Sequence, residues 1–142
     1  MSRFLFGALL GLTSVFVYEL GGVVEGRIWP VMGQLELSEP EAHPPPSYRT
    51  RWKGRATKLR NCNFVRLEWY LGPRHGRHVE VEVEFTDPPE IRMAGELHWD
   101  GIVISLVPEA TLRNSHADVL HRCPGRPWLT RTPFFTSRVA GA

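Results

Sequence analysis

Apolar and polar positions follow different patterns in the first and later parts of the chain. Residues 4–18 carry no charge, and after Glu19 the apolar run continues to residue 24. The 21 residues from 4 to 24 are enough to cross a ~30 Å hydrocarbon core as a helix, which takes about 20 apolar residues. Arg3 precedes the run, as expected for a cytoplasmic N-terminus. The pattern predicts that residues 1–25 form a single-pass membrane anchor.

A cleaved signal peptide is the main alternative for this segment. Arg3 and residues 4–17 would supply its basic and apolar regions, but the bulky residues 15–19 contain no small-x-small cleavage site. A helix buried inside a soluble protein is the third interpretation. The uncleaved anchor is favoured, and the C-terminal domain is then expected outside the cytoplasm, in the periplasm or the extracellular space.

Two features of the anchor point to a partner in the membrane. Gly7 and Gly11 form a GxxxG pair, a spacing that lets two helices approach closely. Glu19 interrupts the apolar run. A charge at the bilayer centre costs roughly 3 kcal/mol, so this carboxylate is expected near the membrane edge or against a partner. We expect Gly7, Gly11 and Glu19 to contact a partner helix.

After the anchor, apolar residues recur at every second position, which is the period of β-strands. Residues 78–85 alternate most regularly, with three valines and Phe85 predicted to face inward and three glutamates outward. A turn at residues 72–76 should join this strand to residues 61–71 as a hairpin. Further strands are predicted at residues 34–38, 48–57, 101–107, 117–123 and 128–136.

Short strands at this spacing predict a mainly β fold, an antiparallel β-sandwich of immunoglobulin-like or fibronectin-like architecture. The chain then divides into the anchor at residues 1–25, a juxtamembrane segment with a proline-rich linker at residues 26–47, and the sandwich at residues 48–142. The apolar tail at residues 127–135 is expected to close the sandwich. Its alternative role is an unpaired edge on which another chain docks.

The two cysteines, Cys62 and Cys123, are the right number for one disulfide if the domain lies outside the cytoplasm. In a cytoplasmic domain they would be two small buried apolar residues. Together with Trp69, they resemble the immunoglobulin pattern of a disulfide beside a tryptophan. Cys62 shares strand parity with Arg66 rather than with the apolar positions, so a bulge is needed to bring it into the core.

A basic stretch at residues 49–60 holds six Lys or Arg and no acid, although the net charge of the chain is only +2. Four of these side chains should share the outer face of one strand: Arg49, Arg51, Lys53 and Arg55. They would suit an anionic partner such as lipid head groups or an envelope polymer. The competing interpretation pairs them with the outward acids of residues 78–85. Trp52 falls on the opposite face, which argues against single-stranded nucleic acid.

The sequence carries no recognised catalytic signature. Its six histidines form no HxH or HxxxH pair on a predicted element, so no metal site is expected. Its serines lack a GxSxG or SxxK context, and Walker or Rossmann glycine patterns do not occur. We therefore expect no catalytic residues and no cofactor. The sequence predicts a non-enzymatic accessory or interaction protein, a subunit or partner of a membrane or envelope complex. The alternative is a module that binds an anionic envelope component.

Overall fold

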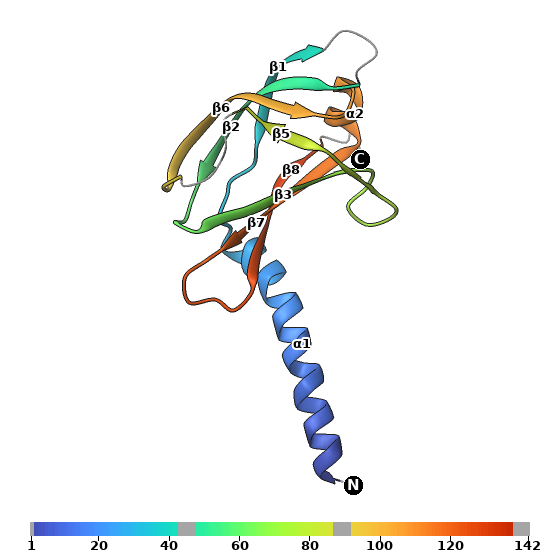
Figure 1. Ribbon diagram of the computed structural model, residues 1–142, viewed down its shortest axis with the longest axis vertical. Helices are drawn as coiled ribbons and strands as arrows, with labels where there is room; N and C mark the ends of the chain where they lie inside the picture. The colour runs from blue at the N-terminus through green and yellow to red at the C-terminus, as the bar shows by residue number, and fades with distance from the viewer. Residues whose placement is uncertain (1, 43–47, 87–91, 138–142) are drawn as a thin grey trace.

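The computed structural model describes residues 2–42, 48–86 and 92–137 as one long helix projecting from a β domain (Figure 1). The helix α1 extends over Ser2–Ile28. Among the described residues the strands are β1 (Glu36–Ala42), β2 (Thr50–Lys58), β3 (Asn63–Leu71), β4 (Val79–Val81), β5 (Val83–Phe85), β6 (Gly95–Ile104), β7 (Ser115–Arg122) and β8 (Leu129–Thr136), with a short helix α2 (Pro108–Arg113) before β7. The predicted N-terminal helix and the mainly β composition are confirmed.

The strands form two antiparallel sheets, with the orders β1-β2-β6-β5 and β4-β3-β7-β8. Buried side chains from both sheets belong to one apolar cluster. Trp69 of β3 stacks on Phe135 of β8, with ring centroids 4.9 Å apart. Trp99 of β6, in the other sheet, meets Phe134 of β8 edge-on at 6.0 Å. The core therefore joins the two sheets, and aromatic rings from both supply much of its buried area.

Strand β2 follows the predicted alternation closely. Its inward side chains are buried from Thr50 to Lys58, and Trp52 is only 1% exposed. The basic side chains point to the other face. Gly54 occupies the inward row because a Cβ there would lie 2.5 Å from the end of the Ile102 side chain. Lys58 is the exception to the pattern, since it is a charged residue in the buried row.

The predicted strand at residues 78–85 is divided between the two sheets. Its first part, β4, pairs with β3 and forms the predicted hairpin. Its second part, β5, crosses to the other sheet and pairs with β6. Val79, predicted to face inward, is 67% exposed because β4 lies at the edge of its sheet. An uninterrupted alternation in the sequence thus conceals a change of sheet.

A register shift in β3 between Phe64 and Arg66 brings Cys62 to the core side. Val65 has the parity of the apolar positions of the predicted strand, yet it is 42% exposed at this bulge, and Phe64 packs against the core instead. Cys62 and Cys123 form a disulfide with Cα atoms 4.5 Å apart. They flank β3 and β7, which are neighbours in one sheet, whereas the immunoglobulin disulfide joins the two sheets.

The segment between the helix and β2 is part of the domain. Strand β1, within the predicted juxtamembrane segment at residues 26–47, pairs with β2. The predicted proline-rich linker, residues 39–46, is wrong over its first half, because residues 39–42 belong to β1; its remaining residues lie outside the described residues. Before β1 the chain follows the edge of β8, where the Leu35 N–H donates to the Phe134 carbonyl at 2.6 Å. The tail therefore closes the β domain, with this edge covered from Thr132 to Phe134 by residues 31–35.

Candidate functional site: the helix–domain junction

The last two turns of α1 lie directly against the start of β8. A Cβ on Gly22 would be 1.9 Å from the Leu129 carbonyl oxygen, and one on Gly26 would be 1.9 Å from the Arg131 carbonyl oxygen. Only glycine permits so close an approach of the helix to the strand backbone. Gly21, the residue before Gly22, faces the Trp128 ring, which a Cβ would meet at 2.8 Å. These glycines hold the helix and the strand together as one unit.

Glu25 lies in the centre of this junction with its side chain only 9% exposed. One carboxylate oxygen accepts from Arg60 Nη2 at 2.8 Å and from Arg126 Nε at 3.2 Å. The other accepts from Trp128 Nε1 at 2.7 Å and from Thr130 Oγ1 at 3.2 Å. A buried carboxylate is costly unless charges and hydrogen bonds compensate it, and these four donors do so.

Arg60 binds the segment that directly follows α1. Its Nη1 donates to the Trp29 carbonyl at 2.8 Å, and its guanidinium lies 4.2 Å from the centre of the Trp29 ring. Two residues on, the Val31 carbonyl accepts from the Leu59 N–H at 2.8 Å. The chain is thus bonded to the domain at Glu25, Trp29 and Val31, and these bonds fix the orientation of the domain relative to α1.

The sequence contains a signal for this junction that the expectations above did not use. Gly22 and Gly26 form a second GxxxG pair, with Glu25 between them. We assigned a membrane contact to the first pair only, Gly7 and Gly11. The second pair packs on a strand of the same chain. The residues that bond Glu25 lie 35 to 105 positions away, so local pattern does not reveal them.

The first two thirds of α1 are exposed. Arg3–Ile28 is long and apolar enough to cross a membrane, with mean hydropathy 1.7. The Thr13 and Ser14 hydroxyls donate to helix carbonyls at 2.9 and 2.8 Å, which satisfies both groups within the helix. Nothing lies within 4 Å of a Cβ placed on Gly7 or Gly11.

The predicted partner contacts spread over about 120° of the α1 surface. At about 100° per residue, Gly11 lies about 40° and Glu19 about 120° around the helix from Gly7. Gly22 and Gly26, which pack on β8, lie between Gly11 and Glu19. Glu19 is exposed. A single partner helix on the Gly7 and Gly11 face would therefore lie under the β7–β8 side of the domain and would leave Glu19 to one flank.

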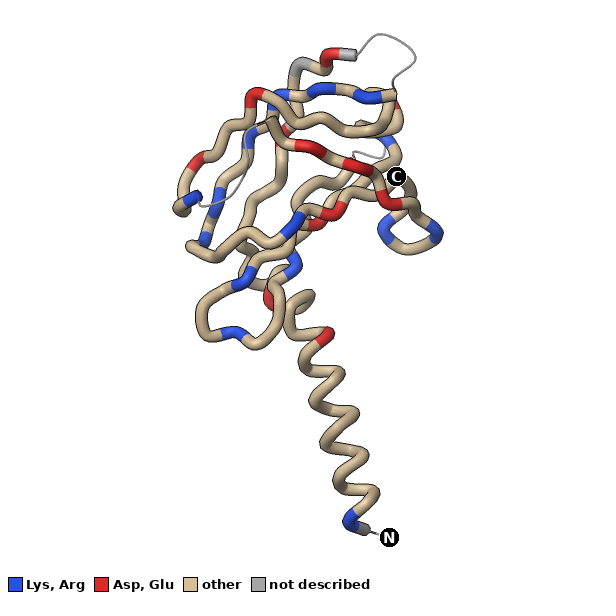
Figure 2. Tube along the Cα trace, in the orientation of Figure 1, with Lys and Arg blue, Asp and Glu red and all other residues tan. Residues whose placement is uncertain are grey.

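Basic positions along β2 lie near acidic positions on neighbouring strands (Figure 2). Arg49 Nη2 lies 2.8 Å from Glu84 on β5, and Arg55 pairs with Glu36 on β1. Arg51 Nη2 donates to the Asp100 carbonyl at 3.3 Å. Lys53 is exposed on the same face and also interacts within the domain.

Sequence reasoning did not identify a charged cluster on the outer face of the β4-β3-β7-β8 sheet. Glu68 and Asp118 are paired across β3 and β7 and are both almost buried. Arg131 Nη1 donates to Glu68 at 2.6 Å and to Asp118 at 3.3 Å, and Arg74 reaches Asp118 at 2.6 Å. The Tyr70 hydroxyl donates to Glu68 at 3.1 Å, and burial raises the pKa of this tyrosine. The cluster holds the β3–β4 turn and β8 onto the sheet.

Two histidines flank Tyr70 beside this cluster. The His78 and His116 ring centroids lie 4.6 and 5.3 Å from that of Tyr70. His116 is buried, which lowers its pKa, and its Nδ1 lies 3.0 Å from the Gly72 carbonyl oxygen. Within the described ranges, no group of three or more His, Cys, Asp or Glu side chains is placed to hold a metal ion.

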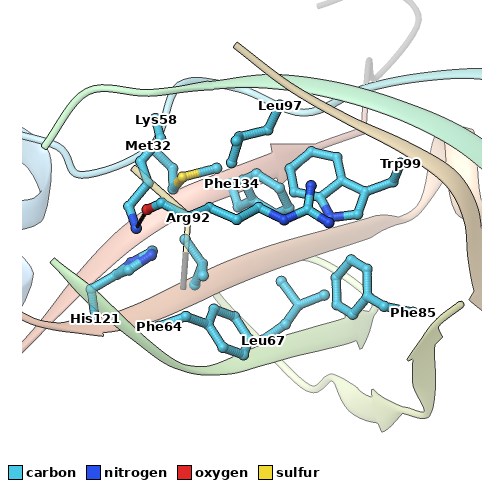
Figure 3. Close-up of a pocket in the computed structure, with 11 residues that line it drawn as sticks. Met32, Lys58, Phe64, Leu67, Phe85, Arg92, Leu97, Trp99, His121 and Phe134 are labelled. Carbon is cyan, nitrogen blue, oxygen red and sulfur yellow. Dashed lines mark hydrogen bonds between the residues drawn. The ribbon is translucent and has the colours of Figure 1, made fainter. Parts of the chain in front are cut away.

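A small cavity lies between the sheets (Figure 3). Lys58 and His121 lie at one end, and Phe85 and Trp99 at the other. Lys58 Nζ donates to the Arg92 carbonyl at 2.5 Å, and burial lowers the pKa of this lysine. Burial also lowers the pKa of His121, to about 4. The cavity volume of about 20 Å³ accommodates a single water, so this space is part of the core rather than a substrate site.

Comparison of the chain with protein-family models, with curated proteins and with solved structures found no match. The junction around Glu25 remains the feature that distinguishes this structure from a β domain on a loose tether. It combines an exposed apolar helix with a buried, fully bonded attachment to the domain.

Proposed function

We propose that this protein is a non-enzymatic, single-pass membrane-anchored accessory or interaction protein, acting as a subunit or partner of a membrane or envelope complex. The observation that carries the proposal is the contrast along α1. All residues of α1 from Arg3 to Leu20 are exposed, and its last turns are bonded to the domain through Glu25. A long exposed apolar surface of this kind suits the interior of a bilayer or another helix rather than water.

A rigid attachment of the β domain to α1 is more than is needed simply to tether the domain to a membrane. A flexible linker lets a domain sample many orientations above the membrane. The bonds at Glu25, Arg60 and Trp29 instead fix the domain relative to the helix. A partner that contacts α1 in the membrane would therefore also set the position of the β domain outside it. This coupling suits a subunit that contacts its partner through both parts.

The finer architecture and the location belong to the same proposal. We assign the domain to the immunoglobulin-like or fibronectin-like sandwich class, because the orders β1-β2-β6-β5 and β4-β3-β7-β8 match the A-B-E-D and C′-C-F-G arrangement of that class. We place the domain outside the cytoplasm, because the Cys62–Cys123 disulfide suits an oxidising compartment. Arg3 at the start of α1 agrees with a cytoplasmic N-terminus.

The alternative function, binding of an anionic envelope component by β2, has less support. Arg49 and Arg55 pair with acids of neighbouring strands, and Arg51 bonds a backbone carbonyl. These contacts favour a structural role for the basic face. Exposed pairs of this kind are worth about 0–1 kcal/mol each, so a ligand with several phosphates could still displace them.

Site-specific photocross-linking in native membranes tests the main proposal. A photoreactive residue at position 11 reports on the Gly7 and Gly11 face, and one at Leu9 is the matched control, about 160° around the helix. We expect one discrete cross-linked partner from position 11 and none from Leu9. Glu19→Ala should leave the domain folded and weaken co-purification of that partner. Equal cross-linking at both positions, or none while the domain is folded, would exclude a specific helix partner.

A further inference from the structure

The exposed part of α1 below the domain is slightly shorter than a bilayer requires. Residues 4–20, all exposed, rise about 26 Å at 1.5 Å per residue, against a hydrocarbon core of ~30 Å. An ordinary bilayer would therefore cover about three more residues, to about residue 23. The helix is not bare over that stretch, because the domain has already begun to pack against it.

The β7–β8 loop (residues 123–128) is the part of the domain that extends along the helix (Figure 1). Trp128 packs on Gly21, and Leu129 packs on Gly22. Pro127 and Trp128 form a shallow groove together with Val17 and Tyr18. The loop thus lies beside residues 17–22 of α1, the stretch that would reach the edge of the hydrocarbon core if the helix spans a bilayer.

The composition of this region suits a membrane interface. The β7–β8 loop contains no acid, and its Arg126 side chain is 40% exposed. At the end of α1, Arg27 is exposed, and Ile28 and Trp29 are 80% and 57% exposed. Tryptophan favours the head-group level, and arginines there bind lipid phosphate. Large exposed apolar side chains next to a spanning helix are expected to contact lipid rather than bulk water.

We propose that the β7–β8 loop and the end of α1 are seated in the head-group layer of the membrane, where Arg27 and Arg126 bind anionic phospholipid. The inference rests on the proposed function in one respect, since it requires α1 to span the bilayer. It places the β domain directly at the membrane surface. It also assigns the lipid contact to the junction rather than to the basic face of β2.

A position in the head-group layer would explain why the Glu25 carboxylate has so many hydrogen-bond donors. Water is scarcer at the head-group boundary than in solution, and an unpaired carboxylate there is correspondingly costly. Glu25 receives two arginine donors, one indole N–H and one hydroxyl. These donors would allow the Glu25 carboxylate to lie near the edge of the hydrocarbon core.

Quenching of tryptophan fluorescence by brominated lipids measures the depth of the loop. The chain has five tryptophans, of which Trp52, Trp69 and Trp99 are buried in the domain core. In Trp29→Phe the remaining membrane-proximal tryptophan is Trp128. The full-length variant is reconstituted into phosphatidylcholine–phosphatidylglycerol vesicles. We expect bromine near the lipid carbonyls to quench strongly and bromine at the chain ends to quench weakly. Adding Trp128→Phe should remove the quenching.

A second measurement tests the lipid charge. Arg27→Glu should lower, several-fold, the enrichment of phosphatidylglycerol over phosphatidylcholine among lipids that co-purify with the protein. Arg113→Glu is the matched control, because Arg113 is 71% exposed on α2 and not on α1 or the β7–β8 loop. Unchanged enrichment in Arg27→Glu, or the same loss in Arg113→Glu, would exclude a lipid site at the junction.

Carbonate extraction distinguishes failure of the proposed membrane anchor from failure of the proposed loop position. If the protein stays in the vesicles and Trp128 is not quenched by either lipid, the seated loop is wrong and the anchor stands. If carbonate releases the protein, the anchor is wrong, and the seated loop is excluded with it. Quenching of Trp128 in carbonate-resistant protein supports both.

Discussion

Glu25 on the last turns of α1 accepts a 2.7 Å hydrogen bond from the indole N–H of Trp128, which lies 103 residues further along the chain. Arg60 and Arg126 donate to the same carboxylate. One side chain therefore connects the helix, the segment after β2 and the β7–β8 loop. The loop begins at Cys123, so the disulfide with Cys62 lies directly beside the contacts that hold α1 to the domain.

Removal of the Glu25 carboxylate should destabilise the β domain although the residue lies in the N-terminal helix α1. Glu25→Ala leaves the Arg60 and Trp128 donors without their acceptor, and we expect a loss of about 2 kcal/mol in the free energy of unfolding. Urea unfolding of the full chain in detergent measures it. Glu19→Ala is the control on the same helix, because Glu19 is exposed. Equal stability of the two variants would contradict a structural role for the junction.

A methyl group added to one glycine of each GxxxG pair should show that the two pairs of α1 have different roles. A Cβ at Gly22 would overlap the Leu129 carbonyl, so Gly22→Ala must push the helix away from β8 and should cost about 1–3 kcal/mol of stability. Gly7→Ala meets open space and should leave the domain unchanged. Thermal unfolding followed by the near-ultraviolet signal of the core tryptophans measures both. Similar melting of Gly22→Ala and Gly7→Ala would show that the close packing does not hold in solution.

The elements that the sequence predicted well are those in which one local rule applies throughout. Strand β2 keeps a strict alternation, and its buried row was correctly assigned from Thr50 onward. Residues 78–85 alternate equally well, yet they change sheets after Val81. Side-chain parity indicates a face and not a partner strand, so alternation alone could not reveal the change.

The bulge in β3 and the Glu25 junction show two further limits. The parity of Cys62 required a bulge, but the pattern did not place it at Val65. Glu25 follows an apolar run, as an acid at a membrane exit would. Its burial depends on Arg60, Arg126 and Trp128, which only the folded chain brings together. Charges that are neutralised by distant residues look like solvent-exposed charges in a sequence.

Burial of His121 should make the domain sensitive to mild acid. Burial and the nearby Lys58 lower the pKa of His121 to about 4, whereas an unfolded histidine titrates near 6.5. As pH falls from about 6.5 towards 4, the unfolded state takes up a proton that the folded state does not. Stability is therefore lost in this range, by up to about 3 kcal/mol.

His121→Gln removes the titrating group and tests this sign. We expect its free energy of unfolding to vary less than that of the wild type between pH 7 and pH 5, a range chosen above the titration of ordinary carboxylates. His98→Gln is the control, because His98 is exposed. A wild-type stability that rises as the pH is lowered through this range would contradict a buried neutral His121.

The disulfide should stabilise both the domain and its attachment to the helix. The bond closes a loop with a sequence separation of 61, for which the chain-entropy model gives about 4 kcal/mol. Because Cys123 begins the β7–β8 loop, its loss should also loosen Arg126 and Trp128 around Glu25. The Cys62→Ala, Cys123→Ala double variant should therefore unfold at lower urea. Glu25→Ala should cost less stability in that background than in the wild type.

A double-mutant comparison measures this coupling, because residues that share a network do not contribute additively. Four proteins are unfolded under the same conditions: wild type, Glu25→Ala, the cysteine double variant and the combined variant. We expect the combined variant to lose less stability than the sum of the two separate losses, by about 0.5–1 kcal/mol. Strict additivity would show that the disulfide supports β3 and β7 alone and that the junction is held independently of it.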